Sequence, residues 1–86
     1  MIQQAFAVFD SKAKVFFVPF FCPSVAVATR AFGTAANDPQ TQISKYPEDF
    51  TLFQIGEFND EDGSLRPFPQ HVNLGLAAQY VREVSL

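Results

Sequence analysis

Short aromatic runs, each ended by a proline or by polar residues, constrain the fold of this chain more than any other feature. Eleven of the 86 residues are phenylalanine, and six of these lie in Gln4–Phe9 and Val15–Phe21. Both runs are rich in strand-forming residues, and the short polar segment between them is typical of a hairpin turn. Pro19 has no backbone N–H to give to a neighbouring strand. We therefore predict a β-hairpin whose second strand ends at Pro19 or lies at a sheet edge.

The hairpin carries apolar residues on both of its faces. In an extended strand, Phe6 and Val8 point to one side, and Ala7 and Phe9 point to the other. A single helix covers only one face of a small sheet, so the other face would stay in contact with water. Burying an exposed phenylalanine contributes about 1.5–3 kcal/mol, so several of them favour association. We expect a homo-oligomer, most simply a homodimer, with these self-association candidates: Phe6, Phe9, Phe20 and Phe53.

A helix is predicted after the hairpin. Ser24 is a good N-cap residue, and apolar side chains recur at helical spacing between Val25 and Ala36. Asn37–Pro39 ends this helix, because the residue before a proline is pushed out of the helical region. Gln40–Tyr46 is predicted to form one further irregular helical turn, ended by Pro47.

The second half of the chain indicates more strands. Phe50–Phe58 is the clearest strand of the sequence, and Asn59–Ser64 is a turn, since its Asp-Gly pair tolerates positive φ. Leu65–Phe68 and Val72–Leu76 are weaker strand candidates separated by prolines, and Leu76–Val81 could equally end the chain as a short helix. The fold class is therefore α+β: an antiparallel sheet in β-β-α-β-β order packed on one helix. Eighty-six residues leave room for one core, so residues 1–86 are expected to form a single domain.

Few residues in the sequence could carry enzyme chemistry. Cys22 has no basic neighbour in the sequence to lower its pKa, and His71 is the only histidine. The acidic segment Asn59–Gly63 has the wrong spacing for a calcium loop, because it would put Phe58 at the first ligand position. The glycines are isolated, so no phosphate-binding loop is formed. We expect no enzyme activity, no catalytic residue, no metal and no cofactor.

The charges are divided unevenly between the two halves of the chain. Residues 1–47 carry four basic and two acidic side chains, a balance of +2, whereas residues 48–86 carry two basic and seven acidic ones, a balance of −5. Lysines that track phosphates beside aromatic rings that stack on bases are typical of single-strand binding. The candidate nucleic-acid-binding residues are Lys12, Lys14, Phe16, Phe17 and Arg30. The competing interpretation is that these phenylalanines are simply core.

The net charge of −3 favours the alternative function, a protein-interaction module that contacts no nucleic acid. The N-terminal residues lack the basic and apolar regions of a signal peptide. The most apolar stretch, Val15–Val27, contains two prolines and is too short to cross a bilayer. No membrane association is therefore expected, and a free Cys22 fits a reducing cytosol.

Several short strings, in order along nearly the whole chain, resemble one viral family. They begin with Ala7–Lys12 and continue through Pro19–Phe21 and Ala28–Phe32. The resemblance is strongest in Asn37–Pro39, Tyr46–Phe53 and Gly56–Phe58, and it closes with Leu74–Gly75. Together they resemble the small nonstructural protein of Microviridae, the icosahedral single-stranded-DNA phages, of the gokushovirus type.

The resemblance implies a nonstructural phage accessory protein that acts in viral single-stranded-DNA synthesis or packaging. It implies that the protein is made in the infected bacterium, stays in the host cytoplasm and is absent from the virion. Single-stranded DNA and a phage or host replication or packaging protein are the partners it suggests. No family active site exists to be carried over to this chain.

Overall fold

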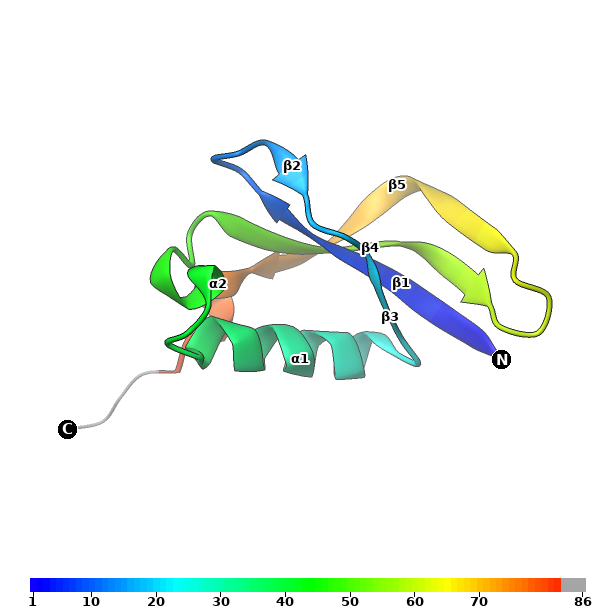
Figure 1. Ribbon diagram of the computed structural model, residues 1–86, viewed down its shortest axis with the longest axis horizontal. Coiled ribbons are helices and arrows are strands. Elements are labelled where there is room, and N and C mark those ends of the chain that lie inside the picture. Colours follow the sequence, from blue (N-terminus) through cyan, green and yellow to red (C-terminus); the bar gives the residue numbers. More distant parts are fainter. Residues whose placement is uncertain (83–86) are drawn as a thin grey trace.

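A computed structural model describes residues 1–82, which form an antiparallel β-sheet with α1 lying along one of its faces (Figure 1). The fold is therefore α+β, as predicted. The elements in chain order are β1 (Ile2–Asp10), β2 (Val15–Phe16), β3 (Phe20–Cys22), α1 (Val25–Asn37), α2 (Gln42–Lys45), β4 (Phe50–Asn59), β5 (Leu65–Leu76) and the 3-10 helix η1 (Ala77–Tyr80).

Strand β1 lies in the middle of the sheet, whose order is β2-β1-β4-β5, and β3 also pairs with β1. The predicted second hairpin strand is thus split in two. The N–H of Phe17 still donates to the carbonyl of Val8 at 2.8 Å, after which the chain leaves the ladder until Phe20. Pro19 lies in this gap, where no N–H is required, which confirms the strand break predicted there.

Strand β5 replaces the two separate strands predicted for this region. It pairs with β4 at both ends, but Pro67 lies opposite Gly56 whereas Val72 lies opposite Gln54. Four residues of β5, 68–71, therefore face a single residue of β4, and β5 rises away from α1 at this point (Figure 1). Such a bulge absorbs residues that cannot continue a regular ladder, and it projects His71 from the sheet.

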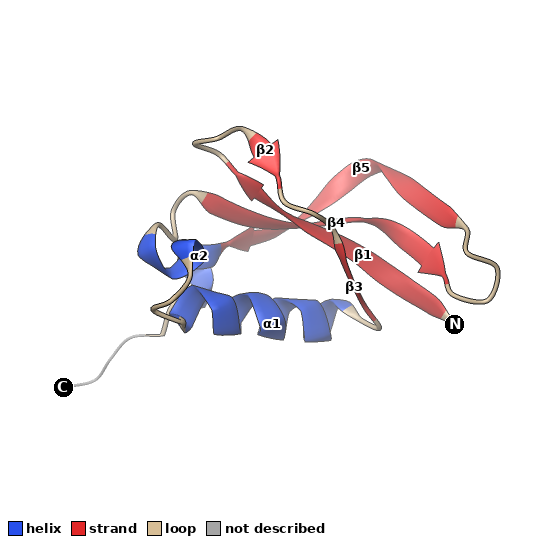
Figure 2. Ribbon diagram, in the orientation of Figure 1, coloured by secondary structure: helices blue, strands red, loops and turns tan. Residues whose placement is uncertain are grey.

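Helix α1 forms as the sequence predicts. The Ser24 hydroxyl accepts a hydrogen bond from the N–H of Val27, and Ala28, Phe32 and Ala36 are buried against the sheet. The helices all lie to one side of the sheet (Figure 2), so they cover one face and leave the other, here called the outer face, without a helix. None of the helices within residues 1–82 has the length and apolar character needed to cross a membrane.

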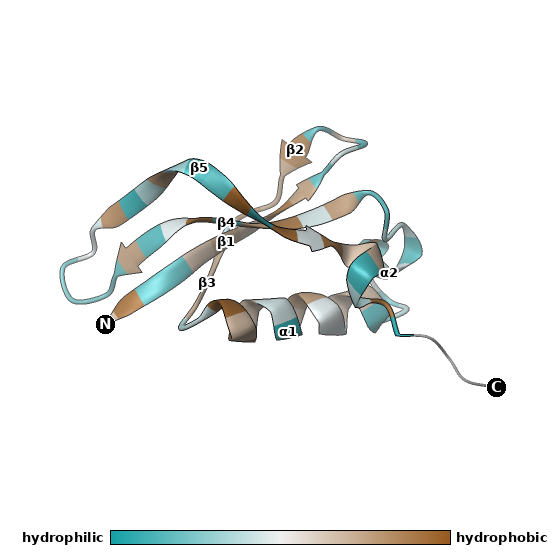
Figure 3. Ribbon diagram, turned by 180° about the vertical axis from the view of Figure 1, so that it is seen from behind, coloured by the Kyte–Doolittle hydropathy of each residue, from teal (hydrophilic) through white to brown (hydrophobic). Residues whose placement is uncertain are grey.

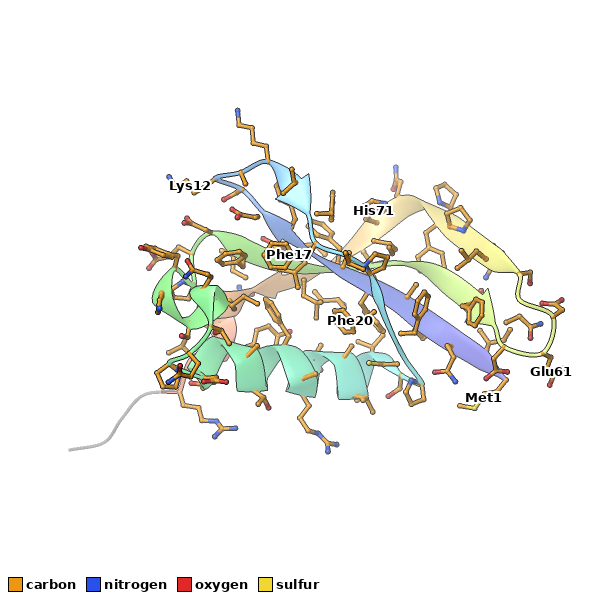
Figure 4. The ribbon with its side chains drawn as sticks, in the orientation of Figure 1. Met1, Lys12, Phe17, Phe20, Glu61 and His71 are labelled. Atoms are coloured by element: carbon orange, nitrogen blue, oxygen red, sulfur yellow. The ribbon has the colours of Figure 1, made fainter. Side chains whose placement is uncertain are left out.

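The core lies between α1 and the sheet. Phe6 and Leu52 are fully buried there, and the ring of Phe20 stacks on that of Phe6 at 5.6 Å between centroids. Figure 4 shows Phe20 directed into the space between the sheet and the helix. The prediction that Phe6 belongs to a self-association surface is therefore wrong, because its side chain is fully buried, whereas Phe20 is half-buried and packs against the same core.

The outer face is covered in part by the edges of its own sheet. Phe16 from β2 contacts Phe9, Phe53 and His71, with ring centroids 4.8, 5.7 and 5.5 Å away. Ala5 and Ala7 also lie on this side, yet they are only 4% and 2% exposed. Phe9 and Phe53, the other two self-association candidates, are therefore half-buried in a cluster within the chain. Less apolar surface on the outer face is therefore left for a second subunit to bury than the alternating sequence pattern predicts.

Candidate nucleic-acid-binding surface at the basic end of the sheet

The β1–β2 turn holds Lys12 and Lys14 at one end of the molecule. One carboxylate oxygen of Asp10 accepts hydrogen bonds from the N–H groups of Lys12 and Ala13, at 2.9 and 3.2 Å. The N–H of Lys14 donates to the carbonyl of Asp10 at 2.7 Å, which closes the turn. Both lysines are exposed, and neither joins an ion pair among residues 1–82. These hydrogen bonds hold the backbone of the turn in place, so the two positively charged lysine side chains extend from an ordered turn.

Lys14 adopts a left-handed backbone conformation, with φ at 60°. This region is disfavoured for a residue with a Cβ, and glycine or asparagine is the usual occupant of such a turn position. A lysine there carries a conformational cost that its packing does not repay, because its side chain is exposed.

Two phenylalanines that follow the turn are exposed, which argues against the interpretation of both as core residues. Phe16 and Phe17 are 44% and 41% exposed. They point to opposite sides of the sheet edge: Phe16 packs on the outer-face cluster, and Phe17 contacts Phe50 at 5.6 Å between centroids. Phe16 is held by three neighbouring rings and Phe17 by one, and each keeps less than half of its surface in contact with solvent.

A groove beside the turn brings in residues from far along the chain. Its lining residues are Asp10 and Lys12 from the hairpin, Gln42 and Tyr46 from α2 and its C-cap, and Asp49 and Phe50 at the start of β4, so two carboxylates border the groove beside Lys12. The N–H of Ser11 donates to the carbonyl of Asp49 at 2.9 Å and ties these segments together. The Tyr46 side chain is exposed, so a third aromatic ring lies next to Lys12.

Tyr46 and its neighbour Lys45 were not singled out by the sequence analysis. The sequence places them 34 and 33 residues after Lys12, and no local pattern links the two segments. The sequence predicts that a helical turn ends at Tyr46, before Pro47, but this prediction does not show which residues lie near Tyr46 in the fold. We refer to Lys12, Lys14, Phe16, Phe17 and Tyr46 as the basic end of the sheet.

Arg30 does not join this surface, which corrects its assignment from the sequence. It lies on α1 between the buried positions Ala28 and Phe32 and faces away from the sheet. There it borders a separate shallow groove with Tyr80 and Arg82. The helix and the core stand between Arg30 and the β1–β2 turn (Figure 1), so one strand of nucleic acid cannot be placed on both by a short path.

The opposite end of the molecule is acidic. Asp60, Glu61 and Asp62 lie in the β4–β5 turn, and the amine of Met1 pairs with Asp60 at 2.6 Å and with Glu61 at 3.3 Å. The hydrogen bond to Asp60 raises the pKa of the Met1 amine, and the same bond lowers the pKa of Asp60. Hydrogen bonds from Ser64 lower the pKa of Asp62. Figure 4 shows Lys12 and Glu61 at opposite ends of the long axis, so these carboxylates lie far from the basic end.

The acidic turn is a hairpin turn and not a metal loop. The side-chain oxygens of Asn59 and Asp62 accept hydrogen bonds from backbone N–H groups two residues later, at 2.9 Å each. Gly63 adopts φ of 77°, as the Asp-Gly pair predicts for a turn. Among residues 1–82, no three His, Cys, Asp or Glu side chains are grouped so that they could hold a metal ion.

Cys22 and His71 lie on opposite faces of the sheet. Cys22 is part of the core beneath α1, and His71 packs edge-on against Phe16 on the outer face. The sheet separates the thiol from the imidazole, so the two cannot form a nucleophile–base pair. The absence of enzyme activity stays a prediction.

Comparison with known proteins adds the viral context. A family model described as phage ORF5 protein matches residues 3–80, a range that includes all the helices and strands except Ile2, the first residue of β1. No curated protein and no solved structure matches the chain. Because the family model spans far more than half of the sequence, the chain belongs to the phage ORF5 protein family.

Proposed function

We propose that this phage protein binds single-stranded DNA at the basic end of the sheet and acts as an accessory factor in viral DNA synthesis or packaging. The observation that carries the proposal is the presence, at one end of the sheet, of three exposed aromatic rings and two lysines that form no ion pair among residues 1–82. Phe16, Phe17 and Tyr46 supply faces for stacking, and Lys12 and Lys14 supply charge for phosphates.

The magnitudes are sufficient for a useful affinity. Stacking of a base on an aromatic side chain contributes about 1–3 kcal/mol, so two or three stacked bases contribute several kcal/mol. Two lysine–phosphate contacts add a term that weakens as salt rises. A total near −8 kcal/mol corresponds to a dissociation constant of about 1 μM. Micromolar affinity per chain is therefore the expected scale.

Single strands fit this surface better than duplexes do. The rings come from a short strand and a loop at a sheet edge, and a ring can stack only on a base that is already unstacked. Only two of the cations lie on the turn, too few for strong binding to duplex phosphates. The acidic turn at the far end repels the DNA backbone, so the expected footprint is short and confined to the basic end.

The conformation of Lys14 is a second support. Backbone strain tends to persist where a side chain is needed for function. Here the strained position carries an exposed cation that makes no contact repaying the cost within residues 1–82. A role for this charge in binding phosphate explains why lysine occupies a position better suited to glycine.

The wider assignment rests on the family and on the resemblance of the ordered strings to the gokushovirus nonstructural protein. As part of this proposal, the protein acts in the cytoplasm of the infected bacterium and is absent from the virion. Its partners there would be the viral single strand and the replication or packaging proteins that act on it.

The test is fluorescence anisotropy with a labelled oligo-dT strand at low and at moderate salt. Lys12→Glu combined with Lys14→Glu should weaken binding at least tenfold. Phe17→Leu, which keeps an apolar side chain but removes the flat ring, should weaken it severalfold. Arg30→Glu is the matched control, because it reverses a charge on the far side of α1 and should leave binding unchanged.

Two results would contradict the proposal: no binding of the wild-type protein at low salt, or equal losses in the lysine variant and in Arg30→Glu. The first result would favour the alternative function, a module that binds a phage or host protein without contacting nucleic acid. The second would show that attraction depends on overall charge and not on the basic end.

A further inference from the structure

The outer face has a second feature, an apolar pocket near the acidic end. It has a volume of about 200 Å³ and is lined almost entirely by apolar atoms, with Phe21, Ile55, Leu65 and Pro67 among its walls. Gly56 forms part of the pocket wall, and the backbone of β5 approaches it so closely that a Cβ there would lie 2.6 Å from a carbonyl oxygen. The pocket is therefore built into the pairing of β4 with β5.

An exposed apolar side chain stands beside this pocket. Val18 is 86% exposed, which is the highest value among the large hydrophobic residues that the structure describes. Its chain neighbour Pro19 is one of the pocket-lining residues. Val18 sits in the gap between β2 and β3, where the chain has left the ladder, so its side chain is presented outward without a partner.

We propose that this region is a homodimer interface in which Val18 of each copy enters the apolar pocket of the other. A two-fold interface uses the same patch on both subunits, so that patch must complement itself. A protruding side chain next to a pocket of suitable size meets this requirement, because one rotation places each protrusion over the pocket of its partner.

Charge favours a second copy at this place and not elsewhere on the outer face. The charged groups that line the pocket, Glu57 and Arg66, form an ion pair with each other, so the patch carries no net charge. Two basic ends in contact would bring Lys12 and Lys14 of one copy against the same lysines of the other. Two acidic turns would repel in the same way. The pocket region can meet its own copy without a like-charge penalty.

The available area fits a weak dimer. Weak and transient interfaces bury less than about 1,200 Å² in total, or about 600 Å² on each partner. The molecule extends 50 Å by 26 Å by 20 Å, and α1 is separated from the sheet along the 26 Å direction (Figure 1), so half of the outer face is about 500 Å² in projection, and a rugged surface exceeds its projection. Phe21 and Leu65, exposed by 46% and 64%, flank the pocket and would be covered together with Val18.

The proposal differs from the self-association surface predicted from the sequence. The four phenylalanines assigned there lie in the core or in the cluster with Phe16, whereas the pocket, Val18 and Leu65 come from segments that the sequence analysis did not assign to any contact. The pocket also lies away from the proposed DNA-binding surface, although Val18 directly follows Phe17 of that surface in the chain.

Sedimentation velocity over a range of micromolar concentrations tests the proposal on the unmodified chain. We expect the mass to approach twice 9.6 kDa as concentration rises. Val18→Asp should weaken dimerisation at least tenfold, and Leu65→Asp, on the receiving side, should act in the same direction. Both positions are exposed, so circular dichroism should show that both variants remain folded.

Val27→Asp is the matched control. It makes the same substitution at an exposed valine near the N-terminus of α1, where an acidic residue is tolerated. It should dimerise as the wild-type protein does. A wild-type protein that stays monomeric at the highest concentration would overturn the proposal, and so would a dimer that persists unchanged in folded Val18→Asp.

Discussion

Replacing Lys14 by glycine should stabilise the protein and weaken its binding to single-stranded DNA at the same time. Lys14 has φ of 60°, a conformation that costs a residue with a Cβ about 1–2 kcal/mol. Glycine avoids this cost, but its greater backbone freedom stabilises the unfolded chain and so lowers the free energy of unfolding by about 0.5–1 kcal/mol. The net gain expected for Lys14→Gly is about 1 kcal/mol, or roughly 4–8 °C in the unfolding midpoint of a domain of this size.

The loss of binding follows from the lost charge. Each phosphate contact to a single strand contributes about 0.7 to the slope of log affinity against log salt. Lys14→Gly should therefore bind more weakly at low salt and show a shallower salt dependence. Lys14→Asn separates the relief of backbone strain from the added freedom of glycine in the unfolded chain, because asparagine tolerates the left-handed conformation without that freedom. Since it also removes the charge, it should weaken DNA binding as Lys14→Gly does.

Ser11→Gly is the control for the stability measurement. Ser11 lies in the same turn without a positive φ, so glycine there should lower the midpoint in thermal or urea unfolding. A midpoint that falls equally in both glycine variants would refute the argument from backbone strain. A stabilised Lys14→Gly protein with unchanged DNA affinity and salt slope would refute the role assigned to the lysine charge.

Three further perturbations test the core, the acidic end and the groove. Leu52 is fully buried beneath α1, so Leu52→Ala should cost about 2–5 kcal/mol in urea unfolding, and a loss well below 1 kcal/mol would contradict this core. Asp60→Asn should lower the pKa of the Met1 amine toward its ordinary value in an NMR titration. The pKa of the Met1 amine is raised in the folded protein, so the ion pair's contribution to stability is lost as pH rises through that pKa. The pKa of Asp60 is lowered, so the same contribution is also lost as pH falls through the pKa of Asp60 in the folded protein. Asp49→Asn removes a negative charge from the groove beside Lys12, so it should tighten oligo-dT binding in the anisotropy assay, and weaker binding would argue against DNA in this groove.

The elements that the sequence predicts well are those whose signals are local. Helix α1 begins at its Ser24 cap and ends before Pro39, because capping and proline sterics act over a few residues. The break in the second hairpin strand follows from Pro19 for the same reason. These effects depend only on neighbouring residues in the chain and not on tertiary packing.

The features that the sequence misses depend on tertiary pairing. Strand β5 is one element despite two prolines, because β4 supplies pairing on both sides of the bulge at residues 68–71. The alternation of apolar residues in β1 does not reveal that β2 and β5 fold over the outer face and bury Ala7. Within the candidate site, Lys12 and Phe16 are local neighbours and were found. Tyr46 reaches them only through the fold, and Arg30 is separated from them by α1.

The two proposals together imply that binding should depend on the length of the DNA strand. The pocket region lies toward the acidic turn and the DNA-binding residues lie at the other end, so a dimer formed at the pocket would carry two separate basic ends. Figure 3 shows the molecule from behind, with the β1–β2 turn and the β4–β5 turn toward opposite ends of the sheet. A strand of about 10 nucleotides matches the site size of one small domain and should bind wild type and Val18→Asp alike.

A strand several times longer can reach both basic ends, and the second contact then forms at high effective concentration. Only the dimer gains from this, so the long strand should bind wild type at least tenfold more tightly than it binds Val18→Asp. Equal affinities of the two proteins for the long strand would mean that the basic ends of the dimer cannot be bridged. A loss for the short strand as well would place Val18 in the DNA contact itself, and the two ends of the outer face would then form one surface.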